Sequence, residues 1–307
     1  NASNKATIML SPIDRIAIAC IVIYTPALLI ACFLAYRHGF GKRAGRLFLI
    51  ILSLSRLIDY SMQLATIKNP TNSNLVIGAN VLASVGVSAL VATMASLLER
   101  VLASIRREGS DPLVKPITQD FAQLAILAGM ILSIIGGTSM GSEIGNAIDG
   151  VGPPVEVSIP VESQVGVGLI MGGFAITALG TFVTLAQLRA VEKGEKRLLI
   201  ALLCVIPFTI VRLVFAGLAT YGSDTRFRSW GGAASYVWWF LGLSVIMEII
   251  AVAILEDVGL TLKKLPKTSR GERFFGSRYR RRNAGAFGPD SKAEEGMTSS
   301  SGHTGVY

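Results

Sequence analysis

The stretch Leu198–Tyr221 has the sequence LLIALLCVIPFTIVRLVFAGLATY, in which Arg212 is the only charged residue. A helix that crosses about 30 Å of hydrocarbon needs about 20 mostly apolar residues, so this stretch is long enough to span a bilayer. The whole chain has the same character, because only 16% of its 307 residues are charged and its mean hydropathy is +0.55. In soluble domains about 25% of residues are charged. The sequence therefore predicts an integral membrane protein.

Six further stretches meet the same requirement of length and apolar content. They are Ile13–Tyr36, Leu47–Ile67, Leu75–Leu98, Phe121–Met140, Val165–Leu188 and Ala233–Asp257. Motifs that end helices follow several of them, such as NPTN after the second stretch and GPP after the fourth. We predict an all-α membrane protein with a seven-helix transmembrane bundle over residues 1–260.

The distribution of Lys and Arg predicts the orientation of the bundle, because cationic loops stay on the cytoplasmic side. Of the 29 Lys and Arg residues, 22 lie in the first, third and fifth loops and after Asp257, five lie on the opposite side, and two lie inside helices. We therefore expect the amino terminus outside and the carboxyl terminus in the cytoplasm, in a multi-pass protein of the plasma membrane.

The composition changes from Thr261 onward, where the chain becomes basic and rich in Gly and Ser. Such a segment cannot bury enough apolar surface to become ordered, so we expect a disordered cytoplasmic tail over residues 261–307. A cation next to an anionic leaflet contributes about 1 kcal/mol of binding. Nucleic acid is the rival partner for a basic cluster, but attachment to a membrane argues against it. The predicted contacts with anionic lipid headgroups are Lys263, Lys264, Lys267, Arg270 and Arg273.

Four ionisable residues lie deep inside the predicted helices, where an unpaired charge costs several kcal/mol. They are Arg56, Asp59, Arg212 and Glu248. Counting from the inner helix ends at the helical rise per residue, Arg56 and Glu248 lie at about 14 Å, Asp59 at about 18 Å and Arg212 at about 21 Å. We predict a buried network that joins the second, sixth and seventh helices, with Arg56 near Glu248 and Asp59 near Arg212.

Two roles are open for this network. It either fixes helix packing or forms a site for a polar ligand or a coupled ion. For the second role the predicted polar lining is Tyr60, Gln63, Tyr236 and Trp239. The corresponding functions are a receptor-like sensor, a small-solute transporter or channel, and a non-catalytic membrane scaffold. Protein partners cannot be inferred from these residues.

Catalytic and cofactor motifs are missing from the sequence. The two histidines, His38 and His303, lie outside the helix interiors, so a histidine-based zinc site cannot be built, and no HExxH or GxSxG motif occurs. The seventh apolar stretch contains no Lys, which excludes a retinal Schiff base. We expect neither an enzyme nor a bound metal or cofactor.

Several motifs resemble an uncharacterised family of fungal seven-transmembrane proteins, known only as a domain of unknown function. The similar motifs are RHGFG at Arg37–Gly41, ATIKNPTN at Ala65–Asn72, GEKRLL at Gly194–Leu199, PFTIVRLVF at Pro207–Phe215 and MEIIAVAILEDVGLTLKK at Met247–Lys264. They extend over nearly the whole predicted membrane part. The resemblance implies the seven-helix architecture and a fungal membrane, and it implies no chemical activity.

A weaker resemblance is to rhodopsin-like receptors. It rests on Glu99-Arg100-Val101 at the end of the third stretch and on Cys204, Pro207 and Phe208 in the sixth. The chain lacks the Asn-Pro motif of those receptors in its seventh stretch and a Cys for their outer disulfide. A Glu-Arg pair at a helix end is also what anchoring at a lipid interface produces.

Overall fold

The structure is a computed structural model that describes residues 11–38, 45–67, 73–107, 111–148, 159–188, 195–222 and 236–261. All the regular structure in these ranges is helical. The first six helices are α1 (Pro12–His38), α2 (Gly45–Ala65), α3 (Ser73–Arg107), α4 (Pro116–Ile148), α5 (Val161–Ala186) and α6 (Lys196–Tyr221). The seventh consists of α7 (Tyr236–Trp239), the π-helical stretch η4 (Phe240–Ile246) and α8 (Met247–Thr261). The predicted seven-helix fold is confirmed.

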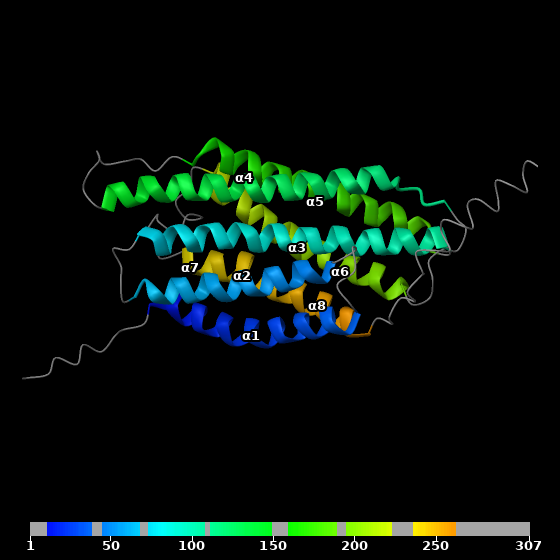
Figure 1. The fold of residues 1–307 in the computed structure, drawn as a ribbon, viewed down its shortest axis with the longest axis horizontal. Coiled ribbons are helices and arrows are strands. Elements are labelled where there is room, and N and C mark those ends of the chain that lie inside the picture. Colours follow the sequence, from blue (N-terminus) through cyan, green and yellow to red (C-terminus); the bar gives the residue numbers. More distant parts are fainter. Residues whose placement is uncertain are drawn as a thin grey trace, which may run out of the picture. The chain divides into compact units, whose positions relative to one another are not determined.

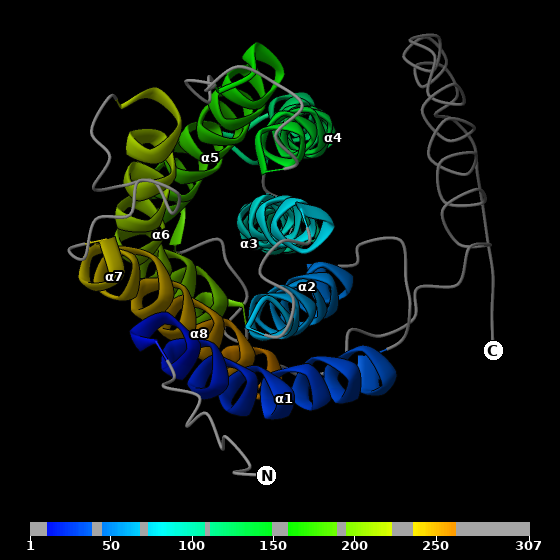
Figure 2. The ribbon, with the colours of Figure 1, turned by 90° about the vertical axis from the view of Figure 1, so that its left-hand side faces the viewer.

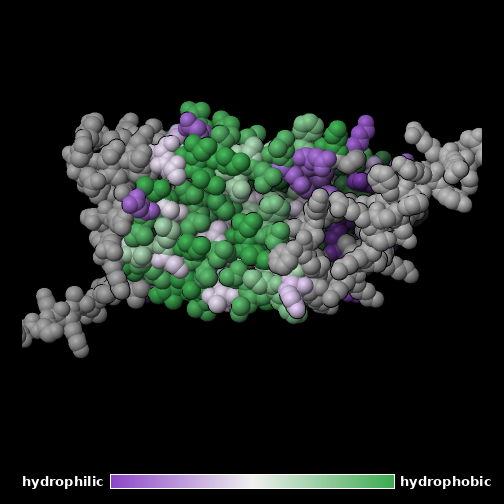
Figure 3. Space-filling view, in the orientation of Figure 1, coloured by the Kyte–Doolittle hydropathy of each residue, from purple (hydrophilic) through white to green (hydrophobic). Residues whose placement is uncertain are grey.

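Each of these seven helices is long and apolar enough to cross a membrane. The face of the protein in Figure 3 carries a broad band of hydrophobic residues, and hydrophilic residues gather mostly toward the two ends of the helices. Large apolar side chains such as Val22, Leu29 and Leu179 are exposed within the spans. A bilayer is the solvent in which such a surface is stable. The chain is therefore a multi-pass membrane protein.

Helix α3 lies at the centre of the bundle and is the most buried of the seven spans. It contacts α2, α4, α5 and α6, while α1 contacts both α2 and α8, and α8 contacts α6. Figure 1 shows the helices lying side by side, and Figure 2, along their length, shows them following one another around α3. This arrangement brings α1, α2, α6 and α8 together along one side of α3.

Local sequence explains where some helices begin and end. At the start of α1, the backbone N–H of Ser11 donates to Asp14 (2.9 Å) and the N–H of Asp14 donates to the Ser11 hydroxyl (3.3 Å), which is a reciprocal cap. Helix α4 begins on Pro116, whose fixed φ suits the first helical position. Helix α3 continues nine residues beyond the predicted end at Leu98, because the residues that follow are buried on its inner face.

Helices α4 and α5 make a close backbone contact that only glycine permits. A Cβ atom added at Gly136 would lie 2.5 Å from the backbone nitrogen of Ser163, and one at Gly166 would lie 2.7 Å from that of Ser133. Helices in lipid gain no hydrophobic free energy by associating with each other, so close contacts of this kind supply the attraction between them. We call this contact the glycine seam.

The predicted tail over residues 261–307 lies outside the described residues, apart from Thr261 at the end of α8. The predicted lipid contacts in it therefore also lie outside, namely Lys263, Lys264, Lys267, Arg270 and Arg273.

Candidate functional site

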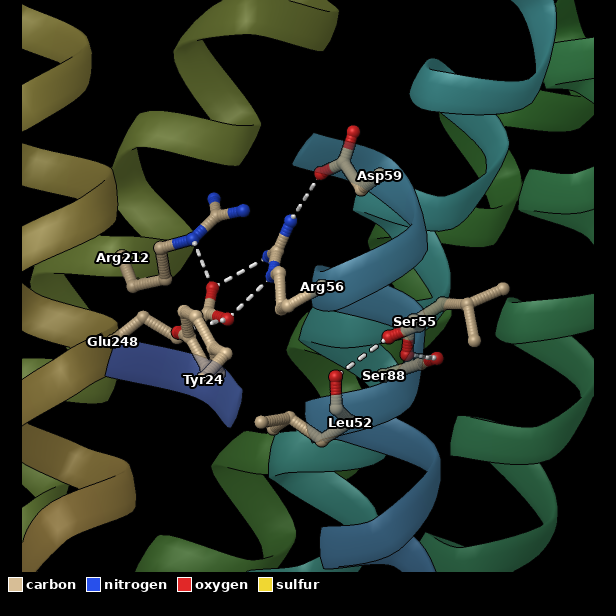
Figure 4. A network of polar contacts seen from close by, with 9 residues as sticks. Tyr24, Leu52, Ser55, Arg56, Asp59, Ser88, Arg212 and Glu248 are labelled. Carbon is tan, nitrogen blue, oxygen red and sulfur yellow. Dashed lines mark hydrogen bonds and ion pairs between the residues drawn. The ribbon is translucent and has the colours of Figure 1, made fainter. Parts of the chain in front are cut away.

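The structure brings the four charged residues of the predicted network together in the middle of the bundle (Figure 4). Arg56 and Asp59 come from α2, Arg212 from α6 and Glu248 from α8, next to the π-helical stretch. Their exposed fractions are 3%, 7%, 5% and 2%, so all four are enclosed by protein. We call this group the charge network.

Glu248 is the hub of the charge network. Its Oε1 atom accepts a hydrogen bond from Arg56 Nε (2.5 Å) and its Oε2 atom accepts one from Arg56 Nη2 (2.5 Å), so this pair is bidentate. Arg212 Nε donates to Oε2 at 3.1 Å, and the hydroxyl of Tyr24 donates to Oε1 at 3.1 Å. One carboxylate thus connects α1, α2 and α6 to α8, and bidentate geometry of this kind is the strongest form of such a pair.

The second acid pairs differently from the prediction. Asp59 accepts a hydrogen bond from Arg56 Nη1 at 3.1 Å, one turn along the same helix. Among the described residues no ion pair joins Asp59 to Arg212, which binds Glu248 instead. Asp59 was expected to lie near Arg212 because their predicted depths are similar. It pairs with Arg56 instead, because residues three apart on one helix face are already neighbours.

On one side of the charge network every polar atom has a hydrogen-bond partner, and on the other side some polar atoms have none among the described residues. Four of the five hydrogen bonds described above converge on Glu248, and the fifth joins Arg56 to Asp59. The terminal nitrogens of Arg212 and the second carboxylate oxygen of Asp59 have no hydrogen-bond partner within the described part of the chain. In Figure 4 these atoms point in the same direction, away from Glu248 and toward the end of α2 that follows Asp59. Two donors and one acceptor therefore remain available for a polar group.

Of the predicted polar lining, Tyr60 lies beside the charge network, where its ring stacks on Tyr24 with centroids 6.2 Å apart. Gln63 and Tyr236 are half-buried, and Tyr236 stacks on Phe240 at 5.5 Å. Trp239 is 44% exposed, and its place in the lining stays a prediction. It lies near the start of the seventh helix, where an indole is stabilised at the membrane–water interface rather than inside the bundle.

The family described as "Domain of unknown function (DUF7702)" matches residues 10–265 of the chain, from before α1 to beyond α8. The chain belongs to this family. The resemblance to an uncharacterised family is thereby confirmed, whereas a fungal origin stays a prediction. No curated protein and no solved structure matches the chain. The charge network of this DUF7702 protein lies entirely within the matched residues.

Two contributors to the charge network of this DUF7702 protein carry no charge and were not assigned to it from sequence. Tyr24 is a fully buried hydroxyl donor on α1. Gly86 on α3 lies against the guanidinium of Arg56, where an added Cβ atom would be 2.7 Å from Nε and 2.9 Å from Cζ. A glycine at this position leaves the space in which Arg56 reaches Glu248.

Replacing Gly86 with Ala is expected to destabilise the protein by about 1–3 kcal/mol, because the new methyl group displaces a guanidinium that three hydrogen bonds hold in place. The matched control is Gly172→Ala on α5, where an added Cβ would meet nothing within 4 Å. Both changes replace a helical glycine within a membrane span, so the helix propensity of alanine affects both equally. Thermal unfolding of both variants in lipid nanodiscs measures the difference, and equal midpoints would contradict the assignment.

A second buried ion pair lies apart from the charge network. Arg100 of α3 donates from Nε to both carboxylate oxygens of Glu195 (3.1 Å each) and from Nη2 to Oε1 (2.7 Å). Glu195 directly precedes α6, and both side chains are buried. Arg100 was interpreted from sequence as a residue at the lipid interface, and its position explains why α3 continues past Leu98. This pair joins the central helix to the start of α6.

Proposed function

We propose that the protein is a receptor-like, non-catalytic membrane sensor whose charge network binds a small polar ligand. One observation carries the proposal: Arg212 and Asp59 keep unpaired hydrogen-bonding atoms that point the same way inside a bundle where every other network atom is engaged. Guanidinium nitrogens suit a carboxylate, and a carboxylate oxygen suits an ammonium or hydroxyl group. The ligand class is therefore a small molecule that carries both kinds of group.

The way Glu248 is bonded supports sensing. Arg56 is shared between Glu248 and Asp59, and Arg212 is held by Glu248 alone. A ligand carboxylate that binds Arg212 competes with Glu248, and a ligand cation that binds Asp59 competes with Arg56. Either competition changes the bonds that link α2, α6 and α8. A ligand that prefers one arrangement of these helices shifts the population of that arrangement.

A transporter or channel is the second candidate, and the π-helical stretch next to Glu248 favours it. Such stretches are rare and often occur at functional sites, where the helix has to change shape. We rank sensing first because α1 to α6 run without an interruption through their described spans, including α6 at Pro207. Transporter sites are typically formed by discontinuous helices.

Ligand binding can be tested with three minimal probes on the full chain in nanodiscs. Acetate presents an acceptor for Arg212, methylammonium presents a donor for Asp59, and glycine presents both. We expect glycine to raise the thermal unfolding midpoint most, because a ligand at 100 times its Kd stabilises the folded state by about 2.7 kcal/mol. Asp59→Asn should reduce the effect of glycine and methylammonium and spare that of acetate.

The control variant is Asp257→Asn, which removes an exposed carboxylate from α8 and should leave all three responses unchanged. Uptake of radiolabelled glycine into proteoliposomes separates the two candidate functions. Saturable uptake that Asp59→Asn abolishes would favour transport over sensing. If none of the three probes shifts the midpoint of the wild type, ligand binding at the network is wrong and the scaffold function remains.

We also propose that the amino terminus lies outside, that the protein resides in the plasma membrane and that the basic tail contacts anionic lipid. The excess of Lys and Arg in the odd-numbered loops and the tail supports this orientation. Epitope tags at the two ends, stained with and without permeabilisation of the cells, test it directly.

A further inference from the structure

Glu256 is a buried carboxylate that the charge network does not use. It lies on α8 eight residues after Glu248, which places it about 12 Å further along the helix. Its exposed fraction is 6%, and its Oε1 atom is fully enclosed and has no hydrogen-bond partner among the described residues. Both acids belong to the buried side of α8, together with Ala251, Val252 and Leu255.

No described cation neutralises Glu256. Helix α8 packs against α6, α1 and η4, and η4 contains no titratable residue. On α1, Leu34 lies against Gly259 of α8 and marks the level of Glu256. Two described titratable side chains of α1 lie near this level, Cys32 and Tyr36. Both are exposed, so they point away from Glu256.

The same holds for the other helix that packs on α8. On α6, Cys204 and Arg197 are exposed, and Lys196 is half-buried at the start of the helix. None of these side chains forms an ion pair or hydrogen bond with Glu256 among the described residues. The neighbouring acid on α8, Asp257, is exposed. Within the described part of the chain, Glu256 therefore faces apolar packing without an opposite charge.

A carboxylate in this position is costly as an anion and far less costly as a neutral acid, because burial penalises the charged form. We infer that Glu256 is a proton-binding site, occupied by a proton at neutral pH in the folded protein. A metal cation would need several oxygen ligands, and the described residues contain no group of three acids, histidines or cysteines around one point. The ligand that the structure supports is a proton.

The position of Glu256 near the end of α8 allows this proton to be released. It lies about five residues, or about 7.5 Å, from the end of α8, so a small movement of the helix end brings it to water. Release of the proton would place a new negative charge on the same helix as Glu248, the hub of the charge network. Proton release at Glu256 and rearrangement of the network are thus linked through α8.

Infrared spectroscopy of the full chain in nanodiscs tests the inference. We expect the wild type at pH 7 to show the carbonyl band of a protonated carboxyl, and Glu256→Gln to lack that band. Asp257→Asn, which changes the adjacent exposed acid, should keep it. A band of equal intensity in wild type and Glu256→Gln would show that Glu256 is ionised and would overturn the inference.

Thermal unfolding against pH gives a second, independent readout. A proton bound in the folded state and released on unfolding contributes stability at low pH that is lost as pH rises. The wild type should therefore lose stability relative to Glu256→Gln as pH increases, and the neutral amide should be tolerated at pH 7. A Gln variant less stable than the wild type at pH 7, or a wild type stabilised by sodium over choline at constant pH, would contradict proton binding. None of these outcomes depends on a ligand at the charge network.

Discussion

Glu248→Gln is expected to abolish most of the folded protein in membranes, and whatever folds should be less stable by about 3–5 kcal/mol. The reason is that two buried arginines lose the same negatively charged partner. Arg212 forms no other ion pair within the described part of the chain, and Arg56 keeps only Asp59. Two buried guanidinium groups would then share one carboxylate. Fluorescence-detected size-exclusion chromatography and thermal unfolding in nanodiscs measure the loss.

A double variant distinguishes lost charge balance from lost packing. In Arg212→Gln with Glu248→Gln, one positive and one negative charge are removed together, and the pair Arg56–Asp59 stays intact. We expect it to recover a large part of the stability lost in Glu248→Gln alone, as a favourable coupling in the double-mutant cycle. The control is Glu162→Gln, an exposed acid in the first turn of α5. If Glu248→Gln unfolds at the same temperature as this control, Glu248 is not the hub.

The second large effect is expected at the ion pair between Arg100 and Glu195. Arg100→Gln or Glu195→Gln should each cost about 3–5 kcal/mol, because each leaves one buried charge without its partner. Both side chains are at least nine-tenths buried, and three hydrogen bonds connect them. The matched control is Arg106→Gln, an exposed cation on the same helix. The exchanged variant, Arg100→Glu with Glu195→Arg, should be more stable than either Arg100→Glu or Glu195→Arg alone. A double variant that is no more stable than the single variants would contradict the pairing.

The fold could be predicted because lipid imposes a simple requirement on sequence. Each spanning helix must be about 20 apolar residues long, and the chain has seven such stretches. The charge network could be predicted for a related reason: a charge such as Arg212 in the stretch Leu198–Tyr221 has to find a partner. Its exact pairing could not, because helical rise gives the depth of a residue but not the direction of its side chain.

Nothing in the sequence indicates that the uncharged residues belong to the site. Tyr24 in the first apolar stretch has the composition of an ordinary core residue, and Gly86 is one of several small residues in the third. The π-helical stretch Phe240–Ile246 contains neither proline nor charge. Arg100 was interpreted as an interface residue, and Glu256 was not singled out, for a different reason: both lie near predicted segment ends, where charges normally face water or headgroups.

The glycine seam joins α4 and α5 backbone to backbone. At Gly136 the backbone of α4 lies so close to Ser163 of α5 that no side chain fits between them. The described residues of the charge network come from α1, α2, α6 and α8, with Gly86 of α3 beside them, and none comes from α4 or α5. We therefore expect α4 and α5 to move as one unit, and a change at Glu248 to displace α1, α2, α6 and α8 more than this pair.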